Sequence, residues 1–212
     1  MSDANLLLNK RASLEAKRKQ YTSAIEILTR LMAYEPDNAG HYVNRGLMYY
    51  NQRQWAQALS DYDHAIELNP RLGKAYSNRA NLYASQRQWL AAMADYDEAI
   101  DLNPLNIRAR LNQAITLREM GEYEEALVCL DIAMFFKPQS ATLYAERGRV
   151  YHLQGDWNCA ITDYSQALDL AADTSSADRE QLNQVNRRVL KWMGSFGYTC
   201  GEGDGEGDGD IE

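Results

Sequence analysis

The prolines of this chain stand at one constant spacing of 34 residues, at Pro36, Pro70, Pro104 and Pro138. A fixed period of this length is typical of a chain built from tandem copies of one supersecondary unit. Aligned on the prolines, the sequence divides into five repeats, at 5–38, 39–72, 73–106, 107–140 and 141–174. Because one repeat cannot bury its own apolar face, the repeats must share one structure and stack on one another.

Each repeat contains two amphipathic segments. In the second repeat, apolar residues recur at three- and four-residue spacing from Tyr42 to Tyr49 and again from Trp55 to Ile66. This spacing predicts two α-helices per repeat. A proline cannot continue the second helix, and it biases the residue before it, such as Asn69, away from helical angles. Each repeat is therefore predicted to be a helix pair that ends near its proline.

Small and aromatic residues also recur when positions are counted from the first residue of each repeat. The eighth place is small, as in Gly46, the twentieth is alanine, as in Ala58, and the twenty-fourth is often aromatic, as in Tyr62. With the proline at place thirty-two, these residues resemble the tetratricopeptide repeat (TPR) family over 5–174. The resemblance implies an all-α fold, an α-solenoid that forms a right-handed superhelix of antiparallel helix pairs. The tryptophans at place seventeen are expected in the core: Trp55, Trp89 and Trp157.

The residues after the repeats divide into two segments. In 175–194, one helix face carries Leu182, Val185, Val189 and Met193. A terminal repeat exposes an apolar flank that needs a cover, so this segment is predicted to be a capping helix that completes an array domain at 1–194. Residues 195–212 are predicted to be a disordered, acidic, Gly-rich tail, because their composition cannot build a core.

Composition argues against several classes of function. No run of about 20 apolar residues is present, so no membrane insertion and a cytoplasmic location are expected. Neither a phosphate-binding glycine loop nor a metalloprotease motif occurs, which predicts a non-enzyme without cofactor or metal. The cysteines are too scattered for a disulfide framework or zinc cluster, and Cys129 and Cys159 are expected to be buried thiols. The histidines fall in three different repeats without metal-ligand spacing: His41, His64 and His152.

Charged residues recur in register. Place seven holds Arg45, Arg79 and Arg147, and place twenty-three of the same repeats holds Asp61, Asp95 and Asp163. These two places lie on facing helices of one pair, so an Arg–Asp bridge is predicted in the second, third and fifth repeats. The fourth repeat has neither residue, and Arg11 of the first stands opposite Ile27. Arg11 is therefore expected to face solvent.

Place six is the candidate binding position, because the family resemblance puts it on the concave groove. It holds Asn44, Asn78 and Asn112. An asparagine amide offers a donor and an acceptor, so it can pair with a peptide backbone of any sequence. The alternative is that these side chains bridge adjacent repeats. The other predicted groove residues are the polar Lys74, Asn81 and Arg108 and the apolar Val43, Leu47, Tyr50, Leu111 and Ile115.

The sequence therefore predicts a non-catalytic protein–protein interaction module, such as an adaptor, scaffold, assembly factor or chaperone-like protein. Its groove is expected to receive an extended or helical segment of another protein, including an acidic one. Three alternatives stay open. The array could self-associate as a homo-oligomer, or the acidic tail could occupy the groove of its own chain. The chain could also bind nucleic acid through the basic first helix, which carries Lys10, Arg11, Lys17, Arg18 and Lys19.

Overall fold

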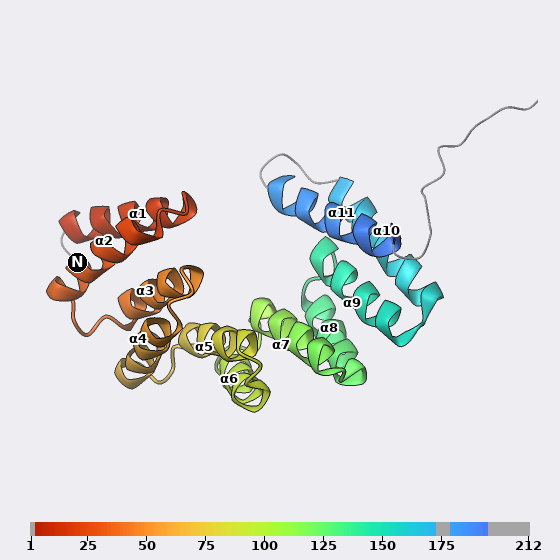
Figure 1. Cartoon of the computed structure of the whole chain (residues 1–212), viewed down its shortest axis with the longest axis horizontal. Helices are drawn as coiled ribbons and strands as arrows, with labels where there is room; N and C mark the ends of the chain where they lie inside the picture. The colour runs from red at the N-terminus through yellow and green to blue at the C-terminus, as the bar shows by residue number, and fades with distance from the viewer. Residues whose placement is uncertain (1–2, 173–178, 195–212) are drawn as a thin grey trace, which may run out of the picture. The chain divides into compact units, whose positions relative to one another are not determined.

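The computed structural model describes residues 3–172 and 179–194, and Figure 1 shows them as α-helices. Eleven helices and no strand occur within these ranges, so the all-α prediction is confirmed. The chain divides into two compact units between Phe136 and Lys137. The first unit contains α1 (Asp3–Lys17), α2 (Tyr21–Tyr34), α3 (Ala39–Asn51), α4 (Trp55–Leu68), α5 (Gly73–Ser85), α6 (Trp89–Leu102), α7 (Ile107–Met120) and α8 (Tyr123–Phe136). The second contains α9 (Ala141–Gln154), α10 (Trp157–Ala172) and α11 (Arg179–Gly194).

In the first unit, consecutive helices form pairs that pack on one another. The pairs are α1 with α2, α3 with α4, α5 with α6, and α7 with α8. The second helix of each pair also packs on the first helix of the next pair. Figure 1 shows that α3, α5 and α7 follow one another along one side of the unit. The first helices therefore form a continuous surface of their own, as a helix-pair solenoid requires.

The ends of the helices are set by the asparagines and prolines of the repeat. Asn69 and Asn103, which precede prolines, have φ/ψ of -145°/90° and -147°/91°. These extended angles confirm the expected effect of the following proline. At the start of two first helices, the side chains of Asn38 and Asn106 accept hydrogen bonds from the backbone N–H groups of Gly40 and Ala109. Such N-caps satisfy donors that have no partner inside the helix.

The link between the two helices of a pair needs a left-handed residue at place fifteen. Gly121 and Gly155 occupy this place with φ of 90° and 84°. In the first three repeats the same place holds Lys19, Arg53 and Arg87, with φ between 58° and 61°. Glycine adopts this conformation without the steric cost that a Cβ atom brings. These two glycines therefore end first helices.

Close packing within a pair depends on the small residue at place eight. A Cβ added to Gly46 would lie 2.7 Å from Cε1 of the buried Tyr62, and one added to Gly148 would lie 2.8 Å from Cδ1 of Tyr164. The expected close approach is thus confirmed at both glycines. The tryptophan prediction is wrong at Trp157, which is 49% exposed. Trp157 begins α10, and the equivalent Trp55 and Trp89, which begin α4 and α6, are half-buried.

The second unit ends in the predicted cap. Helix α11 packs on α9 and α10, and Val185 and Val189 are buried in a cluster with Ala160 and Tyr164 of α10. Across the same contact, Arg188 Nη1 lies 3.0 Å from Oε1 of the buried Glu146. These contacts are those that a capping helix would make, and the capping role of α11 stays a prediction. The side chain of Leu182 and the tail at 195–212 lie outside the described residues.

The start of α3 carries a pH-sensitive cluster around Glu35. Its carboxylate lies 2.9 Å from His41 Nε2 and accepts hydrogen bonds from Asn5 Nδ2 at 2.8 Å and Asn38 Nδ2 at 3.0 Å. These contacts, chiefly that with His41, lower the pKa of Glu35 from 4.5 to about 2. A depressed carboxyl pKa stabilises the folded state above the unfolded value and loses that contribution as the pH falls toward the folded one.

We therefore expect the Glu35 side-chain carboxyl carbon to titrate with a midpoint near pH 2 in NMR spectra. Stability from this group should be complete above pH 4.5 and should be lost between pH 4.5 and about 2. The Glu35→Gln variant removes the titrating group, so its stability should fall less over that range. A Glu35 midpoint near the ordinary value of about 4.3 would contradict the prediction.

Candidate functional site

The predicted Arg–Asp bridges join the two helices of three repeats. Arg45 binds Asp61 through Nε at 2.9 Å and Nη2 at 2.7 Å, and Arg79 binds Asp95 in the same way at 2.7 and 2.8 Å. In the second unit, both contacts of the third pair, Arg147 with Asp163, measure 2.8 Å. The geometry is bidentate and charge-assisted, which makes these strong hydrogen bonds. The structural prediction for all three pairs is confirmed.

Place-seven residues also tie the second, third and fourth repeats to the repeat before them, and Arg45 Nη1 donates to Thr29 Oγ1 of α2 at 3.2 Å. Arg79 Nη1 bonds Asp63 Oδ1 of α4 at 2.6 Å. In the fourth repeat, Gln113 Nε2 bonds Asp97 Oδ1 of α6 at 2.7 Å and accepts a contact from Cys129 Sγ at 3.5 Å. A neutral pair thus replaces the charged one there. Because these bonds hold the first helices in register, they fix the spacing of the side chains on the groove surface.

A cavity of about 370 Å³ lies on that surface between α3, α5 and α7. Asn81 of α5 is its most constrained polar residue. Its Oδ1 accepts hydrogen bonds from Tyr96 OH at 2.7 Å and from Asn112 Nδ2 at 2.9 Å. With Oδ1 held in this way, the plane of the Asn81 amide is fixed, and Nδ2 is the group that can donate. The complete lining is Tyr50, Asn81, Ala84, Ser85, Tyr96, Asn112, Ile115, Thr116 and Glu119.

A basic pair lies on the same first helices. Lys74 Nζ of α5 donates to Asn44 Oδ1 of α3 at 2.9 Å, and Arg108 of α7 is exposed nearby. The pKa of Lys74 is lowered, first because neighbouring side chains shield its ammonium group from water and second because of the Arg108 charge. Two cations that repel each other in this way favour an anionic ligand between them.

The predicted asparagines do not share one role. Asn44 and Asn112 both bond to the neighbouring repeat, so bridging between repeats occurs at these two positions. Each bond uses only one end of the amide, which leaves Asn44 Nδ2 and Asn112 Oδ1 for a ligand. Asn78 differs, because its Nδ2 atom is buried without a hydrogen-bond partner. A buried donor in this state is destabilising until it meets an acceptor.

The apolar candidates separate by burial. Tyr50 and Ile115 line the cavity described above, and Leu47 lines a second cavity of about 190 Å³ against α1, together with Asn44. Leu111 is half-buried on α7. Val43 is fully buried in a cluster with Ala75 of α5, so the expectation that it contacts a ligand is corrected. Val43 packs against α4 of its own pair and α5 of the next pair, and not in the groove.

Sequence reasoning missed several groove residues. Ser85 and Glu119 stand at place thirteen, and Thr116 stands one helical turn beyond Asn112. Ser85 and Thr116 stand four residues after an asparagine, and Glu119 stands three residues after Thr116. This spacing places them on the same helix face, which is a signal that the sequence contained. Tyr96 has no such signal, because it belongs to the second helix and reaches the groove only through its hydroxyl group.

Two equivalent tyrosines provide a matched test of this network. Tyr96 OH bonds Asn81, whereas Tyr62 OH is buried without a partner because Leu47 stands where Asn81 stands in the next repeat. Burial raises the pKa of both tyrosines, that of Tyr96 to about 12. We expect Tyr96→Phe to reduce the free energy of unfolding by about 1 kcal/mol and Tyr62→Phe to be neutral or stabilising. Urea denaturation measures both, and equal losses would contradict the assignment.

Little on the described surface supports bond-making chemistry. No group of three or more His, Cys, Asp or Glu with metal-site geometry occurs among the described residues. Cys159 is exposed, which corrects its expected burial, and its hydrogen bond to Asp156 raises the thiol pKa. Burial, and then the Arg149 charge, lower the pKa of His152 to about 4, so this side chain is neutral near pH 7.

Comparison with protein families agrees with the repeat geometry. Three models, each for the tetratricopeptide repeat, match residues 11–77, 73–104 and 95–128. The chain belongs to the TPR family. TPR proteins with this fold are typically non-catalytic interaction modules, and membership supports a general protein-binding scaffold. A search of the curated proteins gave no match. No helix in the described part of the chain is long and apolar enough to cross a membrane.

Solved TPR structures show the same fold at low sequence identity. MamA is 17% identical with a TM-score of 0.64, and the match covers 84% of this chain and 100% of that protein. MamA from Desulfovibrio magneticus RS-1 is 15% identical with a TM-score of 0.68, covering 83% and 99%. YrrB, described as a TPR protein with an unusual peptide-binding site, is 17% identical with a TM-score of 0.61, covering 85% and 87%. At this identity the likeness concerns the fold alone.

Proposed function

We propose that the surface formed by α3, α5 and α7 is a groove that binds an extended, acidic segment of a partner protein, and that the chain acts as a non-catalytic adaptor or assembly scaffold. The observation that carries the proposal is the fixed amide of Asn81, a residue that lines the cavity and whose Oδ1 accepts hydrogen bonds from two other lining residues, Tyr96 and Asn112. A side chain that is already ordered loses little entropy when a ligand binds. The peptide-binding site of the similar-fold protein YrrB agrees with this use of a TPR surface.

The spacing of the first helices suits an extended peptide. Packed helices lie about 8–10 Å apart, and an extended chain advances about 3.3–3.6 Å per residue. One asparagine therefore meets a peptide unit about every third residue. Asn44, Asn78 and Asn112 would supply three such contacts. Because Asn78 Nδ2 is buried, its side chain must first rotate toward the groove, where it would gain the acceptor that it lacks. A backbone carbonyl is the natural acceptor for it.

Hydrogen bonds from the asparagines are too weak to hold a peptide by themselves, so apolar and ionic contacts are also needed. Each hydrogen bond contributes about 0.5–1.5 kcal/mol, whereas a micromolar complex needs about 8 kcal/mol. Tyr50 and Ile115 offer apolar surface within the cavity. Lys74 and Arg108 add attraction for carboxylates, which is why the proposed ligand is acidic. Because salt screens this attraction, a higher salt concentration should weaken binding of the peptide.

The proposal can be tested with random peptides displayed on phage and selected on the full chain. Selected peptides should be rich in Asp and Glu. Replacing Asn44, Asn78 and Asn112 together by Ala should weaken their binding by about 10- to 100-fold, as the loss of two to three hydrogen bonds predicts. The variant should remain folded at the assay temperature, with a melting temperature lowered only by the loss of the two bonds between repeats that Asn44 and Asn112 make. Unchanged affinity in the triple variant would exclude the groove.

A further inference from the structure

The side of α1 that faces away from α2 exposes two leucines in register. Leu7 and Leu14 are 69% and 46% exposed. They stand at places three and ten of the first repeat. The same places are buried in the first helices of the next three repeats: His41 and Met48 in α3, Ala75 and Leu82 in α5, and Ala109 and Thr116 in α7. The two leucines are thus exposed at positions that this repeat normally buries.

The structure shows what buries these places elsewhere. In α5, Leu82 belongs to one cluster with Ala58 and Tyr62 of α4, the second helix of the preceding repeat. Ala75 belongs to another cluster with Ala65 of the same helix. Places three and ten of a first helix therefore form the surface on which the second helix of the preceding repeat packs. No described helix packs on this surface of α1, because Leu7 and Leu14 are exposed.

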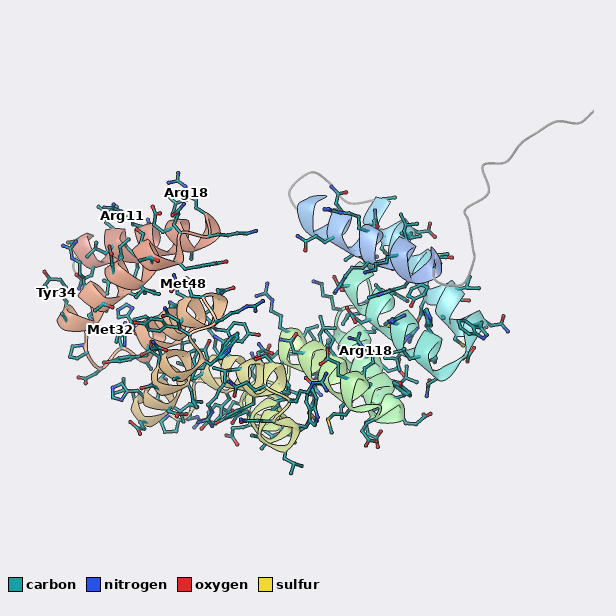
Figure 2. All side chains as sticks on the ribbon, in the orientation of Figure 1. Arg11, Arg18, Met32, Tyr34, Met48 and Arg118 are labelled. Carbon is teal, nitrogen blue, oxygen red and sulfur yellow. The ribbon has the colours of Figure 1, made fainter. Side chains whose placement is uncertain are left out.

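The charge on α1 fits the same pattern. At place seven, Arg79 and Gln113 bond an aspartate on the preceding second helix, at 2.6 and 2.7 Å. Arg11 holds this place in α1 and faces Ile27 in its own repeat, so it is exposed. Figure 2 shows Arg11 and Arg18 projecting outward from α1. Lys10 and Lys17 are also exposed on this helix, which gives the leucine pair a basic border.

We propose that the outer face of α1 is a docking site for an acidic amphipathic helix of a partner protein, which would pack on α1 as α4 packs on α5. The contacts of α4 define its chemistry. Such a helix would present a small residue, as Ala58 does, and an aromatic residue one turn later, as Tyr62 does. An aspartate follows directly at Asp63, and a second small residue stands at Ala65. A membrane or a nucleic acid would match the positive charge. Neither of them requires the arrangement of Leu7, Leu14 and Arg11, whereas the equivalent places of α5 pack against a helix.

The test uses a helix-stapled, fluorescent peptide with the sequence of Trp55–Leu68 and the full-length chain. Stapling is needed because a helix of this length is marginal in water. Fluorescence anisotropy should show saturable binding. The double variant Leu7→Asn with Leu14→Asn should weaken binding of the peptide about tenfold or more, and so should the single variant Arg11→Glu. A tenfold loss of affinity is what the removal of one favourable contact produces. A peptide carrying Asp63→Lys should bind the Arg11→Glu variant better than it binds the wild type.

Matched controls separate this site from the proposed groove and from nonspecific charge. Arg30→Glu reverses an exposed charge on α2, and Leu90→Asn removes an exposed leucine on α6, and neither should change peptide binding. The triple asparagine variant of the groove should also bind the peptide normally. Absence of binding, or binding that Leu7, Leu14 and Arg11 do not affect, would overturn the proposal. The proposal would also be overturned if the peptide does not bind while α1 mediates retention on anionic vesicles or on RNA. Dimerisation through α1 in light scattering, without binding of the peptide, would overturn it as well.

Discussion

Replacing Asp95 by Cys is expected to lower the free energy of unfolding by about 3 kcal/mol, because it removes one partner of a buried ion pair. The side chains of Arg79 and Asp95 are only 20% and 9% exposed, and they share two short hydrogen bonds. Without the carboxylate, the guanidinium group stays in a shielded position with only Asp63 to balance it. For a domain of this size the melting temperature should fall by about 6–12 °C.

The fourth repeat provides the control for this prediction. There Gln113 and Cys129 stand in the places of Arg79 and Asp95 and form a neutral contact, while Gln113 keeps the bond to the preceding helix. The double variant Arg79→Gln with Asp95→Cys copies this pair. It should recover most of the stability that Asp95→Cys loses, because no shielded charge is left alone. A double variant as unstable as the single one would contradict this account of the ladder.

Placing a carboxylate in the buried contact between α11 and α10 should undock α11 from the rest of the second unit. Val189 is fully buried in the cluster with Val185 and Tyr164. Burying an unpaired carboxylate costs several kcal/mol, so Val189→Asp should undock the helix before it buries the charge. Hydrogen exchange should then become fast across the amides of α11 and faster in α10, which α11 covers.

Leu190 is the matched control for this variant, since it is the next residue on α11 and is 48% exposed. Leu190→Asp adds the same charge to the same helix and should change stability by less than about 0.5 kcal/mol. Exchange in α11 should stay at the wild-type rate. If both variants exchange alike, α11 does not hold its place through Val189, and its role as a cap would need another explanation.

Internal comparison explains how much of the fold could be predicted from sequence. Five copies of one pattern show which residues vary together, and the pairing of Arg45 with Asp61 followed from this covariation inside one chain. Helix ends at Asn69 and Asn103 followed from the local effect of proline. Both features lie within a single repeat. The exposure of Trp157 was not predicted, because the repeat pattern assigned all three tryptophans of place seventeen to the core.

The candidate site was harder to predict because its polar groups depend on contacts between repeats. Place nine illustrates this. It holds Leu47 in one repeat and Asn81 in the next, which leaves the hydroxyl of Tyr62 without a partner and gives that of Tyr96 one. Sequence position assigned Asn44 and Asn112 to the groove, but the atom that each amide uses was decided by Lys74 and Asn81. Such choices are set by side-chain packing and not by periodicity.

The most direct test of the groove proposal is a photocrosslink from a bound peptide. A peptide selected on the full chain, carrying a benzophenone group, should label α3, α5 and α7, with adducts at cavity residues such as Ser85, Ile115 and Glu119 identified by mass spectrometry. Labelling should disappear when unmodified peptide competes. Adducts concentrated on second helices, for example at the 88% exposed Leu90 of α6, would contradict the central claim that the first helices bind the partner.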